Sequence, residues 1–300
     1  MIQTRLLIGS ALILLAAAVL YLDGFLAPWY PLLGLTVLAV LWRAAYELQQ
    51  LLEPAHRPPL WLLGLGLSLC WVANWWHRLA ASALPASALC PSSPWTGVLF
   101  AYGLAFLAAF LWEMARYPHA GAALPRLAAT TLILSYLGLF GSCFLQLRLL
   151  PESAEGPPTL AWLVAAIAVP KANDIGAYFT GTFLGRTPMA PHLSPKKTWE
   201  GGAGGLAGGI AAALLLGQWQ PLLFPAGVYE AALFGLVVGG AGMLGDLAES
   251  LWKRDCQAKD AAALLPAFGG LLDVIDSLLF AAPVVYLWSQ FPPSRFPWQP

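Results

Sequence analysis

Residues 6–22 read LLIGSALILLAAAVLYL, an unbroken apolar run that follows a short N-terminal segment containing Arg5. A helix needs about 20 residues to cross the roughly 30 Å of hydrocarbon in a bilayer. The run is close to that length, and no small-residue cleavage site typical of a secretory signal follows it. We therefore expect this stretch to form the first transmembrane helix.

Similar apolar runs recur along the whole chain of 300 residues, of which 59% are hydrophobic and only 10% are charged. Soluble domains carry about 25% charged residues, so a water-facing surface cannot be built from this composition. We predict an all-α, polytopic integral membrane protein with about nine transmembrane helices. The expected spans lie near residues 6–23, 27–46, 59–77, 96–116, 127–147, 158–182, 203–218, 228–246 and 266–290.

Charge excludes one class of function and predicts an orientation. Fifteen Lys and Arg balance fifteen Asp and Glu, and without a basic excess we expect no nucleic-acid partner. If the N-terminus is cytoplasmic, twelve basic residues fall in inside loops and three in outside loops, which the positive-inside rule favours. The inside set is Arg5, Arg43, Arg57, Arg116, Arg126, Lys171, Arg186, Lys196, Lys197, Lys253, Arg254 and Lys259, and the outside set is Arg78, Arg148 and Arg295.

The two halves of the sequence differ in character. Residues 1–157 have clean apolar runs and are expected to be scaffold helices, with Glu113 an interfacial acid at a span edge. Nine of the fifteen acids lie between residues 171 and 276. We therefore expect residues 158–300 to hold the catalytic region.

The sixth span contains the first costly polar groups. Its apolar part, residues 159–169, covers only about 17 Å at helical rise and is followed by Pro170, where we expect the helix to break. An ionisable residue at membrane depth costs about 2.5–3.5 kcal/mol unless it is paired or wet. Lys171 and Asp174, three residues apart, are expected to satisfy each other.

A basic loop and a glycine-rich stretch come next. Ser194-Pro195-Lys196-Lys197-Thr198 offers two hydroxyls and two ammonium groups, which suit phosphate oxygens or, alternatively, anionic lipid headgroups. Six glycines follow within nine residues, and their spacing is typical of close helix packing. They are Gly201, Gly202, Gly204, Gly205, Gly208 and Gly209.

Two acidic pairs then flank a short basic connection. Helical spacing places Asp246, Glu249, Ser250 and Lys253 on one stripe, and Asp273 and Asp276 are again three residues apart. Carboxylates in a partly desolvated site need a counter-charge, and hard oxygen ligands suit Mg²⁺. The alternative is a solvated turn with ordinary surface pairs.

These residues resemble the motifs of phosphatidate cytidylyltransferases, also called CDP-diacylglycerol synthases. The segment from Ser250-Leu-Trp-Lys253-Arg254 through Lys259-Asp260 to Gly269-Gly270-Leu-Leu-Asp273-Val-Ile-Asp276 is similar to that family's signature. Three further motifs match in order and spacing: Asp174 with Ala177-Tyr178-Phe179, the segment 194–201, and Gly245-Asp246-Leu-Ala-Glu249-Ser250. The chain departs from the family pattern at Ala267, Phe268 and Val274, which replace Gly, His and Arg.

The resemblance implies an enzyme of phospholipid biosynthesis that joins CTP to phosphatidate, giving CDP-diacylglycerol and pyrophosphate. It implies Mg²⁺, as one or two cations, held by Asp246 and Asp273 with Glu249 and Asp276. Phosphate-holding and catalytic roles fall to Ser194, Lys196, Lys197, Thr198, Lys253, Arg254 and Lys259, and the polar cavity also takes Asp174, Ser250 and Asp260. We further expect a bacterial inner-membrane location, a site that faces the cytoplasm, contact with membrane lipids, and a homodimer.

Three alternatives stay open. An ion-coupled secondary transporter also has broken helices and intramembrane acids, although no inverted repeat is found in the sequence. A related CTP-dependent lipid enzyme, such as a polyprenol or phytol kinase or an isoprenoid-lipid cytidylyltransferase, would use similar groups. The replaced His and Arg also leave room for an inactive relative.

Overall fold

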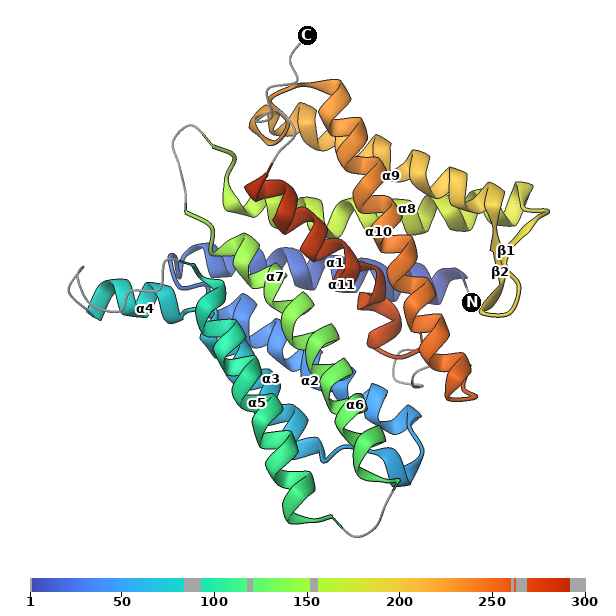
Figure 1. Cartoon of the computed structure of the whole chain (residues 1–300). Coiled ribbons are helices and arrows are strands. Elements are labelled where there is room, and N and C mark those ends of the chain that lie inside the picture. Colours follow the sequence, from blue (N-terminus) through green and yellow to red (C-terminus); the bar gives the residue numbers. More distant parts are fainter. Residues whose placement is uncertain are drawn as a thin grey trace. The chain divides into compact units, whose positions relative to one another are not determined.

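The chain is almost entirely helical, as predicted. The computed structural model in Figure 1 describes residues 2–83, 93–117, 121–151, 156–259, 262 and 269–291. The α-helices are α1 (Ile2–Gly24), α2 (Pro31–Leu51), α3 (Leu60–Ala73), α4 (Trp76–Ala83), α5 (Trp95–Ala115), α6 (Ala123–Ile133), α7 (Phe140–Arg148), α8 (Thr159–Leu184), α9 (Trp199–Trp219), α10 (Val228–Asp255) and α11 (Leu272–Gln290). A π-helical turn, Leu134–Leu139, joins α6 to α7, short 3-10 turns lie at Pro54–His56 and Pro221–Leu223, and strands β1 (Pro188–Ala190) and β2 (Ser194–Thr198) form one hairpin.

The membrane character is confirmed by helix length and hydropathy. Among the described residues, eight helical segments are long and apolar enough to cross a bilayer. They are Leu7–Gly24, Pro31–Leu51, Trp95–Ala115, Ala123–Arg148, Thr159–Leu184, Trp199–Trp219, Val228–Asp255 and Leu272–Gln290. Helix α3 is equally apolar but has only 14 residues. A ninth span and the cytoplasmic N-terminus therefore stay predictions.

Helix α3 is shorter than the span expected at residues 59–77, and Asn74 accounts for its end. The Asn74 amide nitrogen donates to the carbonyls of Cys70 and Trp71, each at 3.0 Å, and its amide oxygen accepts from Gln146 at 2.9 Å. Asparagine side chains that bond to nearby backbone compete with helix continuation. The chain turns at Asn74 and starts again as α4 at Trp76.

The expected break at Pro170 is wrong. Helix α8 runs for 26 residues from Thr159 to Leu184 with Pro170 inside it. The proline is buried, and a Cβ added at Gly242 of α10 would lie 2.9 Å from the Pro170 Cβ, so the neighbouring helix packs directly on the ring. Proline inside a membrane helix is tolerated where adjacent helices surround it.

The chain divides into two compact units. The first unit comprises residues 1–146 and 258–274, and the second comprises residues 147–257 and 275–300. In the first unit, α3 packs against α2, α5 and the π-helical turn, and Leu63, Leu67 and Leu137 are fully buried there. This core is built from large aliphatic side chains.

In the second unit, α8, α9 and α10 pack with their backbones close together. A Cβ added at Gly208 of α9 would lie 2.7 Å from the carbonyl oxygen of Ala172 on α8, and one at Gly235 of α10 would lie 2.6 Å from the Cα of Ile210 on α9. Figure 1 shows α8 and α9 side by side, with the β1–β2 hairpin at one end of the pair. The packing role predicted for the glycine-rich stretch is confirmed.

Candidate active site

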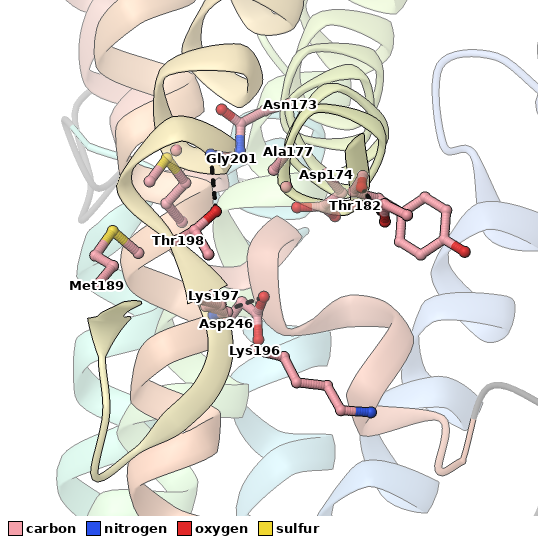
Figure 2. Close-up of a pocket in the computed structure, with 14 residues that line it drawn as sticks. Asn173, Asp174, Ala177, Thr182, Met189, Lys196, Lys197, Thr198, Gly201 and Asp246 are labelled. Atoms are coloured by element: carbon pink, nitrogen blue, oxygen red, sulfur yellow. Dashed lines mark hydrogen bonds and ion pairs between the residues drawn. The ribbon is translucent and has the colours of Figure 1, made fainter. Parts of the chain in front are cut away.

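A cavity of about 400 Å³ lies in the second unit between α8, the hairpin, α9 and α10. Figure 2 shows its lining, to which each of these elements contributes residues. Five of the residues predicted to form the site line it: Asp174 of α8, Lys196, Lys197 and Thr198 of β2, and Asp246 of α10. Residues up to 72 positions apart in the sequence are therefore brought to one cavity.

The hairpin that carries the two lysines is anchored to the start of α9. The Glu200 carboxylate accepts the backbone N–H groups of Arg186 and Thr187, at 3.2 and 3.1 Å, and the Thr187 hydroxyl at 2.9 Å. The Thr198 hydroxyl accepts the N–H of Gly201 at 3.1 Å and so caps α9. These bonds hold β2 beside the cavity.

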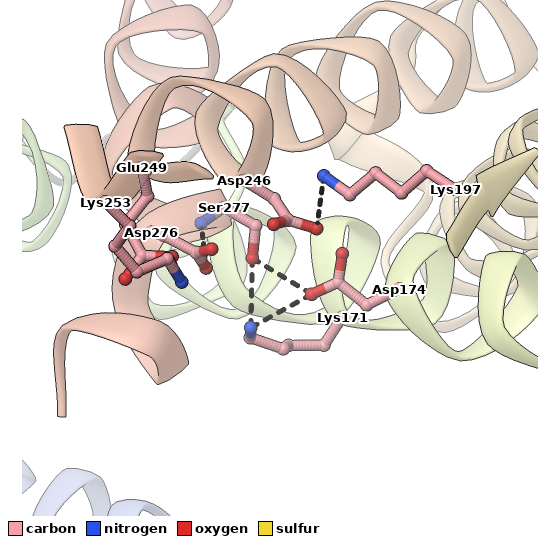
Figure 3. Close-up of polar contacts among 8 residues, drawn as sticks. All are labelled: Lys171, Asp174, Lys197, Asp246, Glu249, Lys253, Asp276 and Ser277. Atoms are coloured by element: carbon pink, nitrogen blue, oxygen red, sulfur yellow. Dashed lines mark hydrogen bonds and ion pairs between the residues drawn. The ribbon is translucent and has the colours of Figure 1, made fainter. Parts of the chain in front are cut away.

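Lys197 connects the basic hairpin to the acids of α10. Its Nζ lies 2.7 Å from Asp246 Oδ2, as Figure 3 shows, whereas Lys196 is exposed. The basic loop therefore contacts the first acidic pair directly. This contact brings together the basic segment 194–198 and the acidic residues of α10, which are separate motifs in the sequence.

Three carboxylates meet beside that contact and form what we call the carboxylate cluster: Asp246, Glu249 and Asp276. One oxygen from each lies within 4.8 Å of the others. The approach of α11 to α10 depends on Gly245, because a Cβ there would lie 2.5 Å from the backbone oxygen of Asp276. Helical spacing on α10 and a glycine contact thus bring together acids from two helices.

The charges of the carboxylate cluster are only partly compensated. Glu249 is 1% exposed and pairs with Lys253 at 2.6 Å, while Asp246 pairs with Lys197. Asp276 is 5% exposed, and in the described part of the chain no basic group lies within ion-pair distance of it. A buried carboxylate without a counter-charge is costly, so this donor set fits a divalent cation bound by oxygen.

A second polar group ties α8 to α11. Lys171 Nζ lies 3.0 Å from Asp174 Oδ2 and donates to the Ser277 hydroxyl at 2.9 Å, and that hydroxyl donates to Asp174 at 3.0 Å (Figure 3). The predicted pairing of Lys171 with Asp174 is confirmed. Ser277 also donates its backbone N–H to Asp276 at 2.6 Å, so it links this group to the carboxylate cluster.

A model of the Cytidylyltransferase family matches residues 3–291. The chain belongs to the Cytidylyltransferase family. Relatives named phosphatidate cytidylyltransferase include one from Synechocystis sp., 45% identical over 140 residues, covering 45% of this chain and 47% of the relative.

Two further relatives with the same name come from other bacteria. The protein of Brucella suis is 39% identical over 151 residues, covering 50% of this chain and 55% of the relative. That of Mycobacterium bovis is 35% identical over 170 residues, covering 57% and 53%. The chain thus spans about half the length of the curated relatives it matches.

Several further residues predicted to form the site do not line the cavity. Ser194 begins β2, Ser250 is buried on α10, and Arg254 Nε donates to the carbonyl of Leu193 at 3.1 Å. Lys259 is exposed, and Asp260, Ala267 and Phe268 lie outside the described residues. Their roles, like those of the residues in the cavity, stay predictions.

Asp273 belongs to the first unit together with the turn that precedes α11. Its Oδ2 accepts the backbone N–H of Gly270 at 2.5 Å. Val274, which replaces the family's Arg, follows it in the first turn of α11. A metal-binding role for Asp273 stays a prediction.

Two polar residues near the site were not predicted as site residues. Asn173, on α8, lines the cavity, is 1% exposed, and its amide has no hydrogen-bond partner among the described residues. Ser277 bonds Lys171 and Asp174, as described above. Their positions in the sequence could have identified them as site residues, because Asn173 lies between Lys171 and Asp174 and Ser277 directly follows Asp276.

Glu47 was also missed, because it lies in the predicted scaffold half. It is 1% exposed, and its carboxylate accepts the backbone N–H groups of Leu271 at 3.1 Å and Leu272 at 2.9 Å, at the start of α11. Arg43, one turn earlier on α2, pairs with it at 3.1 Å. Glu47 therefore positions the beginning of the helix that also carries Asp276.

Proposed function

We propose that this chain is a phosphatidate cytidylyltransferase, which converts CTP and phosphatidate into CDP-diacylglycerol and pyrophosphate. Family membership and the names of the partial relatives support the reaction class. The observation that carries the proposal is the meeting of the carboxylate cluster with Lys197 beside a cavity that Asp174 and Lys196 also line. Acidic residues can bind a metal cation and basic residues can bind phosphate oxygens, and a reaction between two phosphate groups needs both.

The reaction needs little proton removal. A phosphate monoester has a second pKa of about 6, so the lipid phosphate is already a dianion near neutrality. Its oxygen forms a bond to the α-phosphorus of CTP while the bond from that phosphorus to the α,β-bridging oxygen breaks. The electron pair leaves with pyrophosphate, and catalysis consists of positioning and charge stabilisation.

The chain's own cations perform the positioning. Lys196 is exposed at the cavity and is available for the outer phosphates of CTP, while Lys197, held against Asp246, is placed nearer the carboxylate cluster. Lys ammonium groups bind phosphate oxygens as compact charges. Lys171 is fixed by Asp174 and Ser277, and the Asn173 amide offers a donor and an acceptor to the bound substrate.

The carboxylate cluster would hold Mg²⁺, with Asp273 as a further predicted ligand. Bound there, the ion would neutralise charge on the phosphates. The uncompensated carboxylate of Asp276 is the feature that favours a cation at this place. The assignment of Mg²⁺ in particular rests on the hard oxygen donors.

The proposed site must be open to water-soluble CTP and to a lipid. The positive-inside pattern favours the cytoplasmic face for its residues, and the bacterial relatives suggest the inner membrane. We further propose that the protein acts as a homodimer.

Product analysis on the purified full chain tests this function. The chain is incubated in detergent micelles with CTP labelled at the α-phosphorus, phosphatidate and Mg²⁺. We expect the label in a CDP-lipid, with pyrophosphate released. Label in free CDP with a phosphorylated lipid alcohol would identify a lipid kinase, and no transfer to any lipid phosphate tested would contradict the proposal.

A further inference from the structure

A second cavity, of about 510 Å³, lies in the first unit where α3 begins, α5 ends and α6 begins. Its lining includes Arg57, Trp61, Trp112, Arg116 and Arg126. None of its lining residues lines the cavity of the candidate active site. It therefore needs a separate explanation.

One acid and one base of this cavity neutralise each other and form its fixed frame. Glu113 is 6% exposed, and Arg126 grips both its oxygens, with Nε at 2.9 and 3.1 Å and Nη2 at 2.6 Å. Arg126 Nη1 also donates to the carbonyl of Ala55 at 3.1 Å. This pair joins α5, α6 and the segment before α3. Because the two charges of the pair cancel, the net charge of the cavity comes from Arg57 and Arg116.

Arg57 and Arg116 carry that remaining charge. Three guanidinium groups against one carboxylate leave a formal excess of two positive charges, and in the described ranges neither arginine is paired with a carboxylate. Arg57 is held by its bonds to the carbonyls of Leu52 and Gln50, at 2.9 and 2.8 Å. Its Nη1 is not used in these two bonds.

Arg116 is held in a different way, by aromatic rings. Its guanidinium carbon lies 4.2 Å from the centroid of the Trp112 ring, and Trp112 packs edge-on against Trp61 at 4.8 Å between centroids. A guanidinium stacked on an indole keeps its N–H groups directed sideways and available. Two arginines that have no acidic partner among the described residues and are held by other contacts are suited to bind an anion by fork-like hydrogen bonds.

The surroundings indicate an anion that belongs to a lipid. The cavity lies at the ends of apolar helices and is lined by two tryptophans, which favour the headgroup depth of a bilayer. On α5, Leu107, Leu111 and Met114 are 53%, 56% and 70% exposed, so an apolar surface leads away from Arg116. A basic pocket beside exposed aliphatic side chains matches both parts of a phospholipid.

We propose that this cavity binds the phosphate of an anionic phospholipid, at a site separate from the one where phosphatidate reacts. The chemistry shared with free inorganic phosphate is the phosphate group, and the acyl-facing surface of α5 favours the lipid. Arg57 and Arg116 bind the phosphate, while Glu113 and Arg126 keep the pocket in shape. The proposal does not depend on the reaction proposed above.

Native mass spectrometry of the purified full chain in detergent tests this site. The probes are phosphatidylglycerol, a phosphodiester that cannot replace phosphatidate as nucleophile, and phosphatidylcholine with the same acyl chains. We expect retention of phosphatidylglycerol in preference to phosphatidylcholine. Arg116→Gln, an exposed position outside the core, should weaken phosphatidylglycerol binding about tenfold, as expected for loss of one charged hydrogen-bonding partner.

Control variants separate this site from a general charge effect. Arg78→Gln removes an arginine of the first unit that does not line the cavity and should leave lipid retention unchanged. Arg116→Lys, which keeps the charge but loses the stacked fork, should bind less than the parent and more than Arg116→Gln. Equal retention by Arg116→Gln and the parent, or an equal loss in Arg78→Gln, would overturn the proposal.

Inorganic phosphate distinguishes the two sources of the anion. Millimolar phosphate should not displace phosphatidylglycerol from the parent chain, because the lipid also uses the apolar surface. Displacement at that concentration would show that the pocket binds free phosphate and would overturn the assignment to a lipid.

Discussion

Glycines at several helix contacts face different neighbours in the two units. In the first unit, Cβ atoms added at Gly64 and Gly141 would meet the side chains of Trp42 and Leu41, at 2.8 and 2.9 Å, so these glycines leave room for large side chains. In the second unit, those added at Gly208 and Gly235 would meet the backbone of a neighbouring helix. Close backbones bring polar side chains on adjacent helices within reach of one another.

The buried polar side chains of the two units also differ. In the first unit, Asn74, Ser142 and Gln146 form a neutral, fully buried network, with bonds of 3.1 and 2.9 Å. The first unit also buries Glu47 and Glu113, each paired with an arginine, whereas the second unit buries Glu249, Lys253 and Asp276, and no basic group of the described chain lies within ion-pair distance of Asp276. A neutral network stabilises a scaffold, whereas uncompensated charge is suited to binding ions and phosphates.

The largest effect is expected from Asp246→Asn. This change removes one carboxylate of the cluster and the partner of Lys197, so cytidylyl transfer should fall roughly a thousandfold, the upper range for losing one electrostatic contact in an active site. Turnover of labelled CTP by purified variants measures it. The matched control is Glu230→Gln, because Glu230 is a buried acid at the other end of α10 that accepts the N–H of Ala226 at 2.9 Å. Loss of activity in both variants alike would remove the distinction between the carboxylate cluster and other buried acids of the same helix.

A pair of glycine variants tests the contrast in packing. Gly245→Ala puts a methyl group 2.5 Å from the backbone of Asp276, and the resulting shift of α11 should lower turnover roughly tenfold to a hundredfold. In Gly64→Ala the nearest atoms to the new methyl group are those of the Trp42 ring, a half-exposed side chain that can move, so this variant should keep near-parent turnover. Equal turnover by the two variants would contradict the difference in glycine use.

A smaller effect is expected at Glu47, which holds the start of the helix that also carries Asp276. Glu47→Gln replaces one of two accepting oxygens by an NH₂ group that faces the N–H donors of Leu271 and Leu272, which should cost about 1–3 kcal/mol locally. We expect a several-fold fall in kcat with little change in KM for CTP, and partial rescue by Glu47→Asp. Steady-state kinetics measures it, and unchanged kcat would limit Glu47 to a structural role.

Local spacing accounts for what could be predicted from the sequence. Residues three or four apart share a helix face, so the pairing of Lys171 with Asp174 and of Glu249 with Lys253 follows from sequence alone. The packing role of the glycine-rich stretch follows from its small-residue period in the same way. The eight long apolar helices likewise follow from length and hydropathy in the described chain.

What could not be predicted depends on neighbours distant in the sequence. Pro170 stays within a helix because Gly242 of α10 lets that helix cover the ring, and Glu47 meets residues more than 220 positions away. The early end of α3 depends on Asn74, whose amide oxygen is bonded by Gln146, 72 residues on. None of these contacts leaves a periodic pattern in the sequence.

Cation binding by the carboxylate cluster is most directly measured with Mn²⁺, a paramagnetic substitute for Mg²⁺, titrated into the purified full chain and followed by electron paramagnetic resonance. The parent chain should bind Mn²⁺, Asp276→Asn should weaken that binding at least about tenfold, or 1.4 kcal/mol, and Glu230→Gln should leave it unchanged. Mn²⁺ binding by Asp276→Asn that equals binding by the parent would contradict the proposed cation site.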